Sequence, residues 1–283
     1  MWERWALGMN EVNNKWAACI VYYQDLASLQ ALINNLNTQT LKPCEIFVAD
    51  NDSSTSANIN NSDLKVSVIK LSSNLGFGVA ANSAIKKAIE NGYDRFILFS
   101  QDVLLENTSC EKIINKLLDN KGIVFPTMLN RKTNQVFSKG GVINIFTGKI
   151  SLKTRKVPKN IYWADGSCLG FDKNTFLKTN GFTEKFFMYF EDVDFCLKAK
   201  KNQIQLNHVD TIASQNPNGP TAYLRSKNSI LVARNYNNKI FVMSVFKRNL
   251  VGALLLLIKF NFKEGFQRIK GIKDGLRLDF ERN

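Results

Sequence analysis

Short apolar runs alternate with stretches of helical periodicity through the first third of the chain. Leu and Ile recur at helical spacing over residues 25–39, and a second helix is predicted over about 79–91, closed by Gly92. Strands that are apolar almost throughout are typical of sheets buried on both faces. The alternation therefore predicts an α/β fold, with a mostly parallel sheet flanked by helices on both faces. The predicted strands are residues 16–23, 44–52, 65–71 and 94–102.

An aromatic-rich segment with glycine hinges, residues 163–201, carries a dense set of candidate chemical groups. It places three carboxylates, Glu191, Asp192 and Asp194, at the start of a predicted helix. An active-site base is one interpretation. The other is structural, because carboxylates favour the first turn of any helix, where backbone N–H groups lack partners.

The apolar spacing of this helix predicts how it is oriented. Phe190, Val193 and Leu197 recur at helical intervals, so we expect them to face the core. Glu191 and Asp194 share a different side of the helix. The pattern therefore predicts that the acids lie at a rim of the domain.

The chain divides into an α/β region, residues 1–218, and a helical extension, residues 219–283. Within the extension, the apolar run 250–258 is shorter than the roughly 18 residues expected of a membrane-spanning helix. Apolar groups mixed with cations suit a helix lying in an anionic membrane interface, although packing on the α/β region or in a homo-oligomer is the alternative. The basic and aromatic neighbours of the run are Lys247, Arg248, Lys259, Phe260, Phe262 and Phe266.

Composition limits the kinds of partner. Lys and Arg number 38 against 24 Asp and Glu, a formal charge of +14 that attracts nucleotides, nucleic acid or acidic lipid. Nucleic acid is not favoured, because the chain has no nucleic-acid-binding motif. Five scattered cysteines without CxxC spacing predict neither a disulfide framework nor a cysteine zinc site. The first residues lack the apolar stretch of a secretion signal, so we expect a cytoplasmic protein.

Polar residues follow the predicted strands, where parallel sheets bind ligands. Asp50 and Asp52 end the second strand, and Asp102 ends the fourth. A carboxylate at the tip of a central strand can hold a divalent cation beside a diphosphate. Gly76 and Gly78 precede a helix and permit close backbone approach to an anion. Ordinary turn formation explains the same residue types, so these remain two interpretations.

Five segments in one order carry a family resemblance. They are IVYYQD, VADNDSS, NLGFGVAANSAI, FILFSQD and NGFTEKFFMYFEDVDFCLKAKKNQIQL. Together, over about residues 15–209, they resemble the inverting glycosyltransferases of family 2, closest to the bacterial rhamnosyltransferase and galactofuranosyltransferase branch. The resemblance implies a GT-A (Rossmann-like) fold, a nucleotide-diphosphate sugar donor and Mg²⁺ or Mn²⁺.

The resemblance also implies roles for individual residues. Asp192, with Glu191 beside it, matches the catalytic base, and Asp102 matches the metal ligand. The nucleotide-binding half covers about 15–103, and the acceptor and catalytic half covers about 104–218. Within the second half, the short strands and basic residues of 122–158 lie either on the acceptor side or in a solvated loop. Residues matched to the nucleotide and donor are Tyr22, Asp50, Asp52, Asn74, Gly76, Phe77, Ala80, Asn82 and Gln101. Residues matched to the acceptor or sugar are Trp163, Asp165, Gly166 and Ser167.

Two positions depart from the family pattern. Ser100 stands where relatives carry the first acid of an acid-x-acid pair, and Ser214 or Gln215 stands near the place of a metal-binding histidine. His208 lies several residues earlier and is either a ligand or a structural residue. The departures predict weak metal affinity. They also leave open a catalytically impaired homologue that acts as a nucleotide-sugar-binding or scaffold subunit.

The expected function is inverting transfer of a rhamnose-like sugar to a glycan acceptor in bacterial surface polysaccharide (O-antigen or capsule) biosynthesis. The resemblance favours dTDP-rhamnose as donor, with a UDP-sugar as the alternative, and a lipid-linked acceptor. We expect the protein to lie peripherally at the inner face of the plasma membrane.

Overall fold

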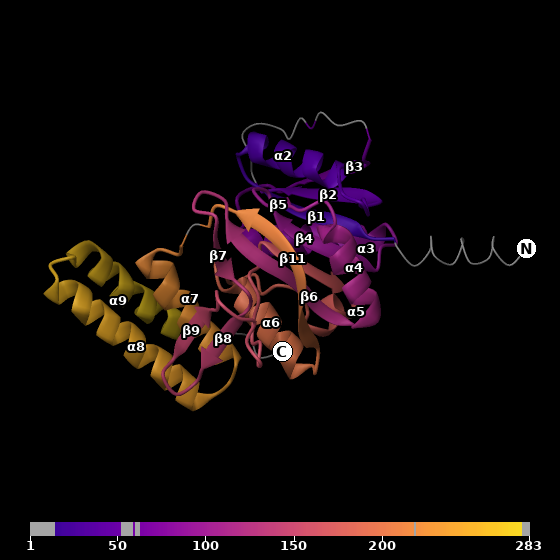
Figure 1. Cartoon of the computed structure of the whole chain (residues 1–283). Helices are drawn as coiled ribbons and strands as arrows, with labels where there is room; N and C mark the ends of the chain where they lie inside the picture. Colours follow the sequence, from indigo (N-terminus) through magenta and orange to yellow (C-terminus); the bar gives the residue numbers. More distant parts are fainter. Residues whose placement is uncertain (1–14, 52–58, 60–62, 218, 279–283) are drawn as a thin grey trace, which may run out of the picture.

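The computed structural model describes residues 15–51, 59, 63–217 and 219–278 (Figure 1). Four parallel strands occupy the apolar runs of the first third, as predicted. In the described residues they belong to a nine-stranded sheet of order β3-β2-β1-β4-β10-β6-β11-β5, in which β7 pairs with β6. The strands are β1 (Ala17–Tyr22), β2 (Glu45–Asp50), β3 (Val66–Lys70), β4 (Arg95–Ser100), β5 (Leu104–Leu105), β6 (Gly122–Asn130), β7 (Gln135–Ser138), β10 (Cys168–Asp172) and β11 (Gln205–Gln215).

Helices cover both faces of this sheet. Successive residues of β1 enter two different cores, as the period of two in a strand requires. Cys19 packs on the side of α3 (Phe77–Glu90), and Ile20 packs on the side of α2 (Leu26–Asn37). Helix α4 (Ser109–Asp119) shares the α2 face, and α6 (Glu191–Lys201) shares the α3 face. The short helix α5 is Lys173–Lys178. Helix α3 begins two residues before the predicted start.

Strand direction brings distant segments to one edge of the sheet. Strands β1 to β4 are parallel, so their carboxyl ends meet there. Strand β10 runs antiparallel to β4, so the residues that precede it lie beside the end of β4. The Ser100 N–H donates to the Ser167 carbonyl oxygen at 3.0 Å. A two-stranded sheet of β8 (Gly141–Asn144) and β9 (Lys149–Leu152) lies apart from the main sheet.

The last three helices form a lobe beside the sheet (Figure 1). They are α7 (Ala222–Asn235), α8 (Lys239–Ile258) and α9 (Phe262–Arg277), and all three pack against one another. The expectation of an apolar run too short to span a bilayer is wrong, because the helix continues well before residue 250. By length and composition alone, α8 could cross a membrane, and 22% of its most apolar window is buried in the lobe.

Candidate active site

Four carboxylates gather at the carboxyl edge of the sheet. Asp102 follows β4, Asp165 lies in the loop before β10, and Glu191 with Asp192 begins α6. Asp165 interacts electrostatically with each of the other three. Like charges held together disfavour ionisation, and shifted pKa values of this kind are a mark of candidate catalytic sites.

Asp192 is held by two backbone donors. Its Oδ2 accepts from the Gly166 N–H at 3.0 Å, and its Oδ1 accepts from the Val193 N–H at 2.8 Å. Burial, reinforced by the negative charge of Asp165, raises the pKa of Asp192 to about 7. A carboxylate with that pKa is half ionised near neutral pH, which suits a general base.

Glu191 is a different kind of acid from its neighbour. It is buried, with 6% of its surface exposed, and its Oε2 has no hydrogen-bond partner among the described residues. Burial, with Asp192 beside it, raises the pKa of Glu191 well above its usual value. Burial therefore favours the neutral carboxylic acid, the form in which Glu191 can donate a hydrogen bond.

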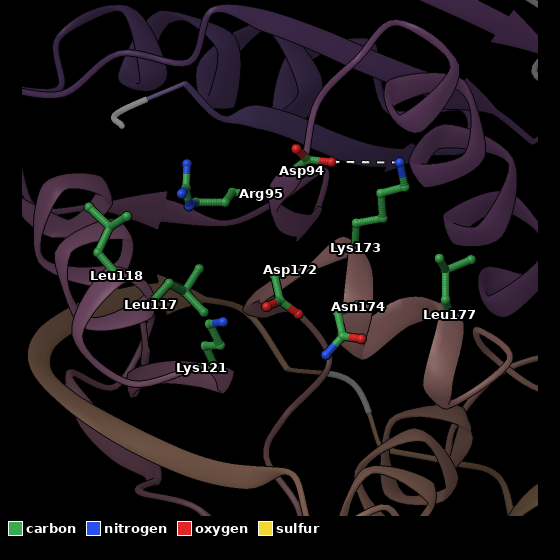
Figure 2. A pocket seen from close by; sticks show the side chains of 9 residues that line it. All are labelled: Asp94, Arg95, Leu117, Leu118, Lys121, Asp172, Lys173, Asn174 and Leu177. Atoms are coloured by element: carbon green, nitrogen blue, oxygen red, sulfur yellow. Dashed lines mark ion pairs between the residues drawn. The ribbon is translucent and has the colours of Figure 1, made fainter. Parts of the chain in front are cut away.

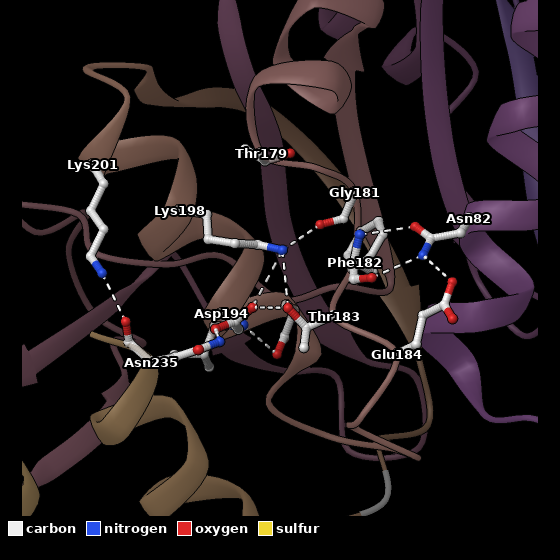
Figure 3. A network of polar contacts seen from close by, with 12 residues as sticks. Asn82, Thr179, Gly181, Phe182, Thr183, Glu184, Asp194, Lys198, Lys201 and Asn235 are labelled. Carbon is white, nitrogen blue, oxygen red and sulfur yellow. Dashed lines mark hydrogen bonds and ion pairs between the residues drawn. The ribbon is translucent and has the colours of Figure 1, made fainter. Parts of the chain in front are cut away.

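The predicted rim position of Glu191 and Asp194 is wrong, because both are buried. Asp194 is the centre of a polar network that supports α6 (Figure 3). It accepts from Thr183 Oγ1 at 2.6 Å and from Asn235 Nδ2 of α7 at 2.6 Å, and it pairs with Lys198 Nζ at 3.5 Å. Helix α7 covers the side of α6 that periodicity assigned to solvent.

The backbone just before Asp192 is held in an uncommon conformation. Tyr189 and Phe190 both have positive φ, 68° and 72°, which bulky residues rarely adopt. The Asn228 side chain of α7 donates to the carbonyl oxygens of Met188 and Tyr189, each at 2.9 Å. Strain of this kind persists where surrounding contacts enforce it, and it is concentrated at functional sites.

The nucleotide side predicted from sequence forms a second group of polar residues at the edge. Asp50 is buried at the end of β2. Asn51, which was not among the residues matched to the nucleotide, joins this strand to the next loop. Its amide donates to Asn74 Oδ1 at 2.9 Å and accepts from the Leu75 N–H at 2.9 Å. Gly76 follows with φ 92°.

Helix α3 meets the segment before α6 at this point. The Phe77 N–H donates to the Phe187 carbonyl oxygen at 2.9 Å. A Cβ at Gly76 would collide with the same carbonyl group, so only glycine allows this approach. The nucleotide side and the loop before Asp192 are therefore in direct contact.

Other predicted nucleotide residues have packing roles. Ala80 and Asn82 are buried on α3, and the Asn82 amide exchanges two 2.9 Å hydrogen bonds with the backbone of Phe182 (Figure 3). Tyr22 is buried at the end of β1, and Phe77 packs partly against the core. Asp52 lies outside the described residues.

Gln101 and the 163–167 loop complete the edge. Gln101 bridges β4 to the end of β1, accepting from the Tyr23 N–H at 2.6 Å and donating to the Tyr23 carbonyl at 3.1 Å. Asp165 accepts from the Ser167 N–H at 3.1 Å, and burial raises the pKa of Asp165. Trp163 is 9% exposed and packs on Gly141, so it is a packing residue and does not offer an open aromatic face to a sugar.

Asp102 has neighbours that the sequence analysis missed. Arg131, just after β6, donates to the backbone carbonyl of Asp102 and to that of Ser214. Burial raises the pKa of Asp102, while its own backbone, Arg131 and the Asn216 backbone N–H favour the charged form. Asn216 Oδ1 is buried without a hydrogen-bond partner among the described residues. Asn216 thus stands near the place where a histidine was expected.

His208 lies away from this edge. Its Nε2 is 2.9 Å from Thr127 Oγ1, and its ring packs on Phe125 with centroids 5.6 Å apart. At the rise of a strand, eight residues separate it from Asn216 by roughly 20 Å or more. The structural interpretation of His208 is therefore the correct one.

A pocket of about 360 Å³ lies at the opposite end of β4 (Figure 2). Arg95, which begins β4, and Asp172, which ends β10, contribute to its wall, and Lys173 pairs with Asp94 at 3.7 Å across one side. Ligands of parallel sheets bind at the carboxyl ends of the strands, so this pocket is not the candidate site.

Comparisons with known proteins agree with this geometry. The sequence model of the family described as Glycosyl transferase family 2 matches residues 17–194, a span that includes Asp102 and Asp192. The dTDP-rhamnosyl transferase RfbF of Shigella flexneri is 25% identical over 211 residues, which cover 71% of this chain and 68% of that protein. The low-salt glycan biosynthesis hexosyltransferase Agl10 of Haloferax volcanii is 23% identical over 229 residues, or 77% and 73% of the two chains.

A further relative and two solved structures extend the comparison. The rhamnosyltransferase WbbL of Escherichia coli is 28% identical over 153 residues, covering 47% of this chain and 58% of that protein. S. aureus TarS 1–349 in complex with UDP-GlcNAc superposes with a TM-score of 0.61 at 16% identity, over 93% of this chain and 81% of that one. The complex of the same protein with UDP has a TM-score of 0.54, over 94% and 75%. At this identity the structures establish the fold.

Proposed function

Because the chain belongs to glycosyl transferase family 2, we propose that it moves a rhamnose-like sugar from a nucleotide-diphosphate donor to a glycan acceptor with inversion at the anomeric carbon. The observation that carries the proposal is Asp192. It is fixed by Gly166 and Val193, has a pKa near 7, and lies beside the edge where Asp50, Asn74 and Gly76 gather.

The chemistry follows from the state of each acid. A sugar hydroxyl is a poor nucleophile, so Asp192 accepts its proton as the oxygen attacks the anomeric carbon. Attack from the face opposite the leaving diphosphate inverts the configuration. In its neutral form Glu191, with an unpaired Oε2, can hold a substrate oxygen as a hydrogen-bond donor. The two adjacent acids can take different roles because Asp192 accepts from two backbone N–H groups, whereas Glu191 Oε2 has no partner among the described residues.

Arg131 and Asn216 fit a site for the diphosphate end of the donor. Mg²⁺ and Mn²⁺ take oxygen ligands, and Mg²⁺ keeps several waters, so one or two protein oxygens are enough. The Asp102 carboxylate and the unpartnered Asn216 Oδ1 would supply them. In the part of the chain that the structure describes, no group of three or more His, Cys, Asp or Glu forms a metal site. A bound divalent ion would neutralise charge on the leaving diphosphate.

The donor and acceptor are proposed from the relatives. RfbF is a dTDP-rhamnosyl transferase and WbbL a rhamnosyltransferase, which favours dTDP-rhamnose, whereas TarS with UDP-GlcNAc keeps a UDP-sugar as the alternative. We place the reaction in bacterial surface polysaccharide synthesis, with a lipid-linked glycan as the acceptor.

A second function is favoured by one observation. Ser100 removes one carboxylate from the metal strand, and the described residues offer no cluster of three metal-binding side chains. A nucleotide-sugar-binding or scaffold subunit without transfer activity would have this composition. Activity with a bound donor decides between the two functions.

Donor binding is expected to raise the melting temperature of the purified protein. A ligand at a hundred times its Kd stabilises the folded state by about 2.7 kcal/mol. The measurement is thermal unfolding against a panel of dTDP-sugars and UDP-sugars, with and without Mg²⁺ or Mn²⁺. We expect the largest shift with dTDP-rhamnose and a divalent ion. A panel without any shift would contradict the transferase and leave the scaffold subunit.

Asn216→Ala is expected to weaken Mn²⁺ binding in the presence of dTDP by about tenfold, because it removes one oxygen ligand. Asp102→Asn should weaken it further, since it removes the charged ligand. Isothermal titration calorimetry measures both affinities without any transfer reaction. The matched control is Asn174→Ala, an exposed residue of α5 beside the remote pocket. Equal Mn²⁺ affinity in the Asn216 variant and this control would remove Asn216 from the site.

A further inference from the structure

The outer side of the C-terminal lobe is apolar where a soluble helix is normally polar. Its most exposed α8 residues recur at helical spacing and include Val251 (54% exposed), Leu255 (52%) and Ile258 (71%). The turn residue Phe260 is 81% exposed, and Phe262 and Phe266 of α9 are 51% and 62% exposed. Soluble proteins rarely expose a contiguous apolar patch of this kind without a partner.

Packing within the lobe assigns these residues to one side of the α8–α9 hairpin. On α8, the opposite side is buried and includes Asn249, whose amide donates to Ser229 Oγ of α7 at 2.9 Å. On α9, Gly271 and Gly275 lie directly on the backbone of α7. Both exposed stripes therefore face away from α7, and we call them the outer face.

Charge decides which partner fits the outer face. Both helices carry exposed cations, while the acids between residues 239 and 278 are Glu264 and Asp274. Asp274 is engaged by the Tyr223 hydroxyl at 2.9 Å. In a symmetric dimer the same patch meets itself, so these cations would repel one another. The exposed cations are Lys239, Lys247, Arg248, Lys259, Lys263, Lys270, Lys273 and Arg277.

Arg268 adds a site for an anionic group at the seam of the hairpin. It lies against Gly252 of α8, and its Nε is buried without a hydrogen-bond partner among the described residues. Burial and the nearby charges of Arg225 and Arg248 lower the pKa of Arg268, while Glu264 favours its charged form. The described residues contain no ion pair to Arg268 within 4 Å. A phosphate group would satisfy this guanidinium.

We propose that the outer face of the α8–α9 hairpin docks onto an anionic phospholipid bilayer, with both helices lying in the plane of the interface. Apolar side chains enter the acyl boundary, and the exposed cations of both helices meet acidic headgroups. Crossing the bilayer would remove Asn249 from its hydrogen bond to Ser229 and separate α8 from α7, so the helix lies on the membrane although its length would allow it to span. This inference does not rest on the proposed transfer reaction.

Docking would also orient the candidate active site. Helix α7, which packs against the hairpin, holds the loop before Asp192 through Asn228 and holds α6 through Asn235. The site is thus attached to the membrane-facing lobe by side-chain hydrogen bonds, which fixes its orientation relative to the bilayer.

The test is cosedimentation of the full chain with vesicles of phosphatidylcholine, alone or mixed with phosphatidylglycerol. We expect binding to the mixed vesicles that weakens as salt is raised, because exposed charges are screened. Leu254 is 49% exposed beside Leu255 on α8. Leu254→Ser with Leu255→Ser should lower the vesicle affinity on the order of tenfold or more, since both side chains leave the apolar contact. The matched control is Leu177→Ser on α5, 60% exposed and outside the lobe, which should bind like the unchanged chain.

Two further variants test the charge. Lys263→Gln and Lys270→Gln should each weaken binding by about fivefold on the mixed vesicles and leave binding to phosphatidylcholine alone unchanged. Circular dichroism establishes that each variant is folded. Failure of the chain to bind either vesicle type would overturn the proposal. So would a stable dimer that dissociates in the double leucine variant while vesicle binding is unchanged. Bound protein that resists alkaline carbonate extraction would overturn the in-plane arrangement.

Discussion

Asp192→Asn is expected to lower the transfer rate by about 10²–10⁴-fold while donor binding is kept. The amide preserves the shape of the side chain but cannot take a proton from the attacking hydroxyl. Release of nucleoside diphosphate, followed with a saturating acceptor, measures the rate, and the donor-induced melting shift reports binding. Loss of the melting shift together with the rate would mean that Asp192 supports the fold of the site instead of acting as the base.

The neighbouring Glu191→Gln variant is the matched control for Asp192→Asn. Burial favours the neutral form of Glu191, and glutamine closely resembles that form. We expect a loss of about tenfold or less, from one altered hydrogen bond to substrate. If Glu191→Gln abolished transfer and Asp192→Asn did not, the roles of the two acids would have to be exchanged.

The pKa of Asp192 predicts two opposite dependences on pH. Transfer should rise with pH and reach half its maximum near 7, because the base acts when deprotonated. Stability runs the other way. Folding raises the pKa of this carboxyl from 3.8 to about 7. Well below pH 3.8 the carboxyl is protonated in both the folded and the unfolded state, so it does not affect the free energy of unfolding. Between these two pKa values it ionises more readily in the unfolded state, so the free energy of unfolding falls as the pH rises to about 7. Asp192→Asn should therefore melt higher than the unchanged protein at pH 8, and this gain should vanish near pH 4.

Hydrophobic periodicity and the polar residues at strand ends were sufficient to predict the parallel strands of the sheet and part of the candidate site. The apolar runs predicted β1 to β4, since buried parallel strands need apolar residues on both faces. Asp102 was found because it follows such a run. The same rule could have found Arg131, which follows the largely apolar strand β6. It was missed because residues 122–158 were placed on the acceptor side or in a solvated loop and not in the main sheet. Asn216 follows β11, whose sequence QLNHVDTIASQ is not an apolar run, so the rule had no signal there.

The burial of Glu191 and Asp194 could not be predicted from their own helix. Helical spacing identifies the side that faces the sheet, and it carries no information about a helix that covers the other side later in the chain. Asn235 of α7 bonds Asp194, and Asn228 holds the loop before Glu191, across about 40 residues of sequence. The environment that raises both pKa values is a tertiary property, so the residue types predicted an active site without predicting how each acid is held.

Gly76→Ala is expected to destabilise the protein by about 2–4 kcal/mol more than Gly92→Ala, a cost in the range of severe backbone and packing conflicts. Both glycines have positive φ, 92° and 85°, so both variants suffer the backbone strain of an L residue, about 1 kcal/mol. A Cβ at Gly92 meets nothing within 4 Å, whereas a Cβ at Gly76 collides with the Phe187 carbonyl. Urea unfolding of the two variants measures the difference directly.

The collision at Gly76 should also lower the rate of the transfer reaction. The Phe187 carbonyl accepts from the Phe77 N–H, so displacing it moves the strained backbone at Tyr189 and Phe190 that leads into Asp192. We therefore expect Gly76→Ala, in the fraction that stays folded, to lose at least tenfold in transfer rate, because small displacements of catalytic groups are costly. Gly92→Ala should keep its rate. Equal stability and equal rate in the two variants would show that the contact between α3 and the loop before Asp192 is dispensable, and the base would then have to be positioned by Gly166 and Asn228 alone.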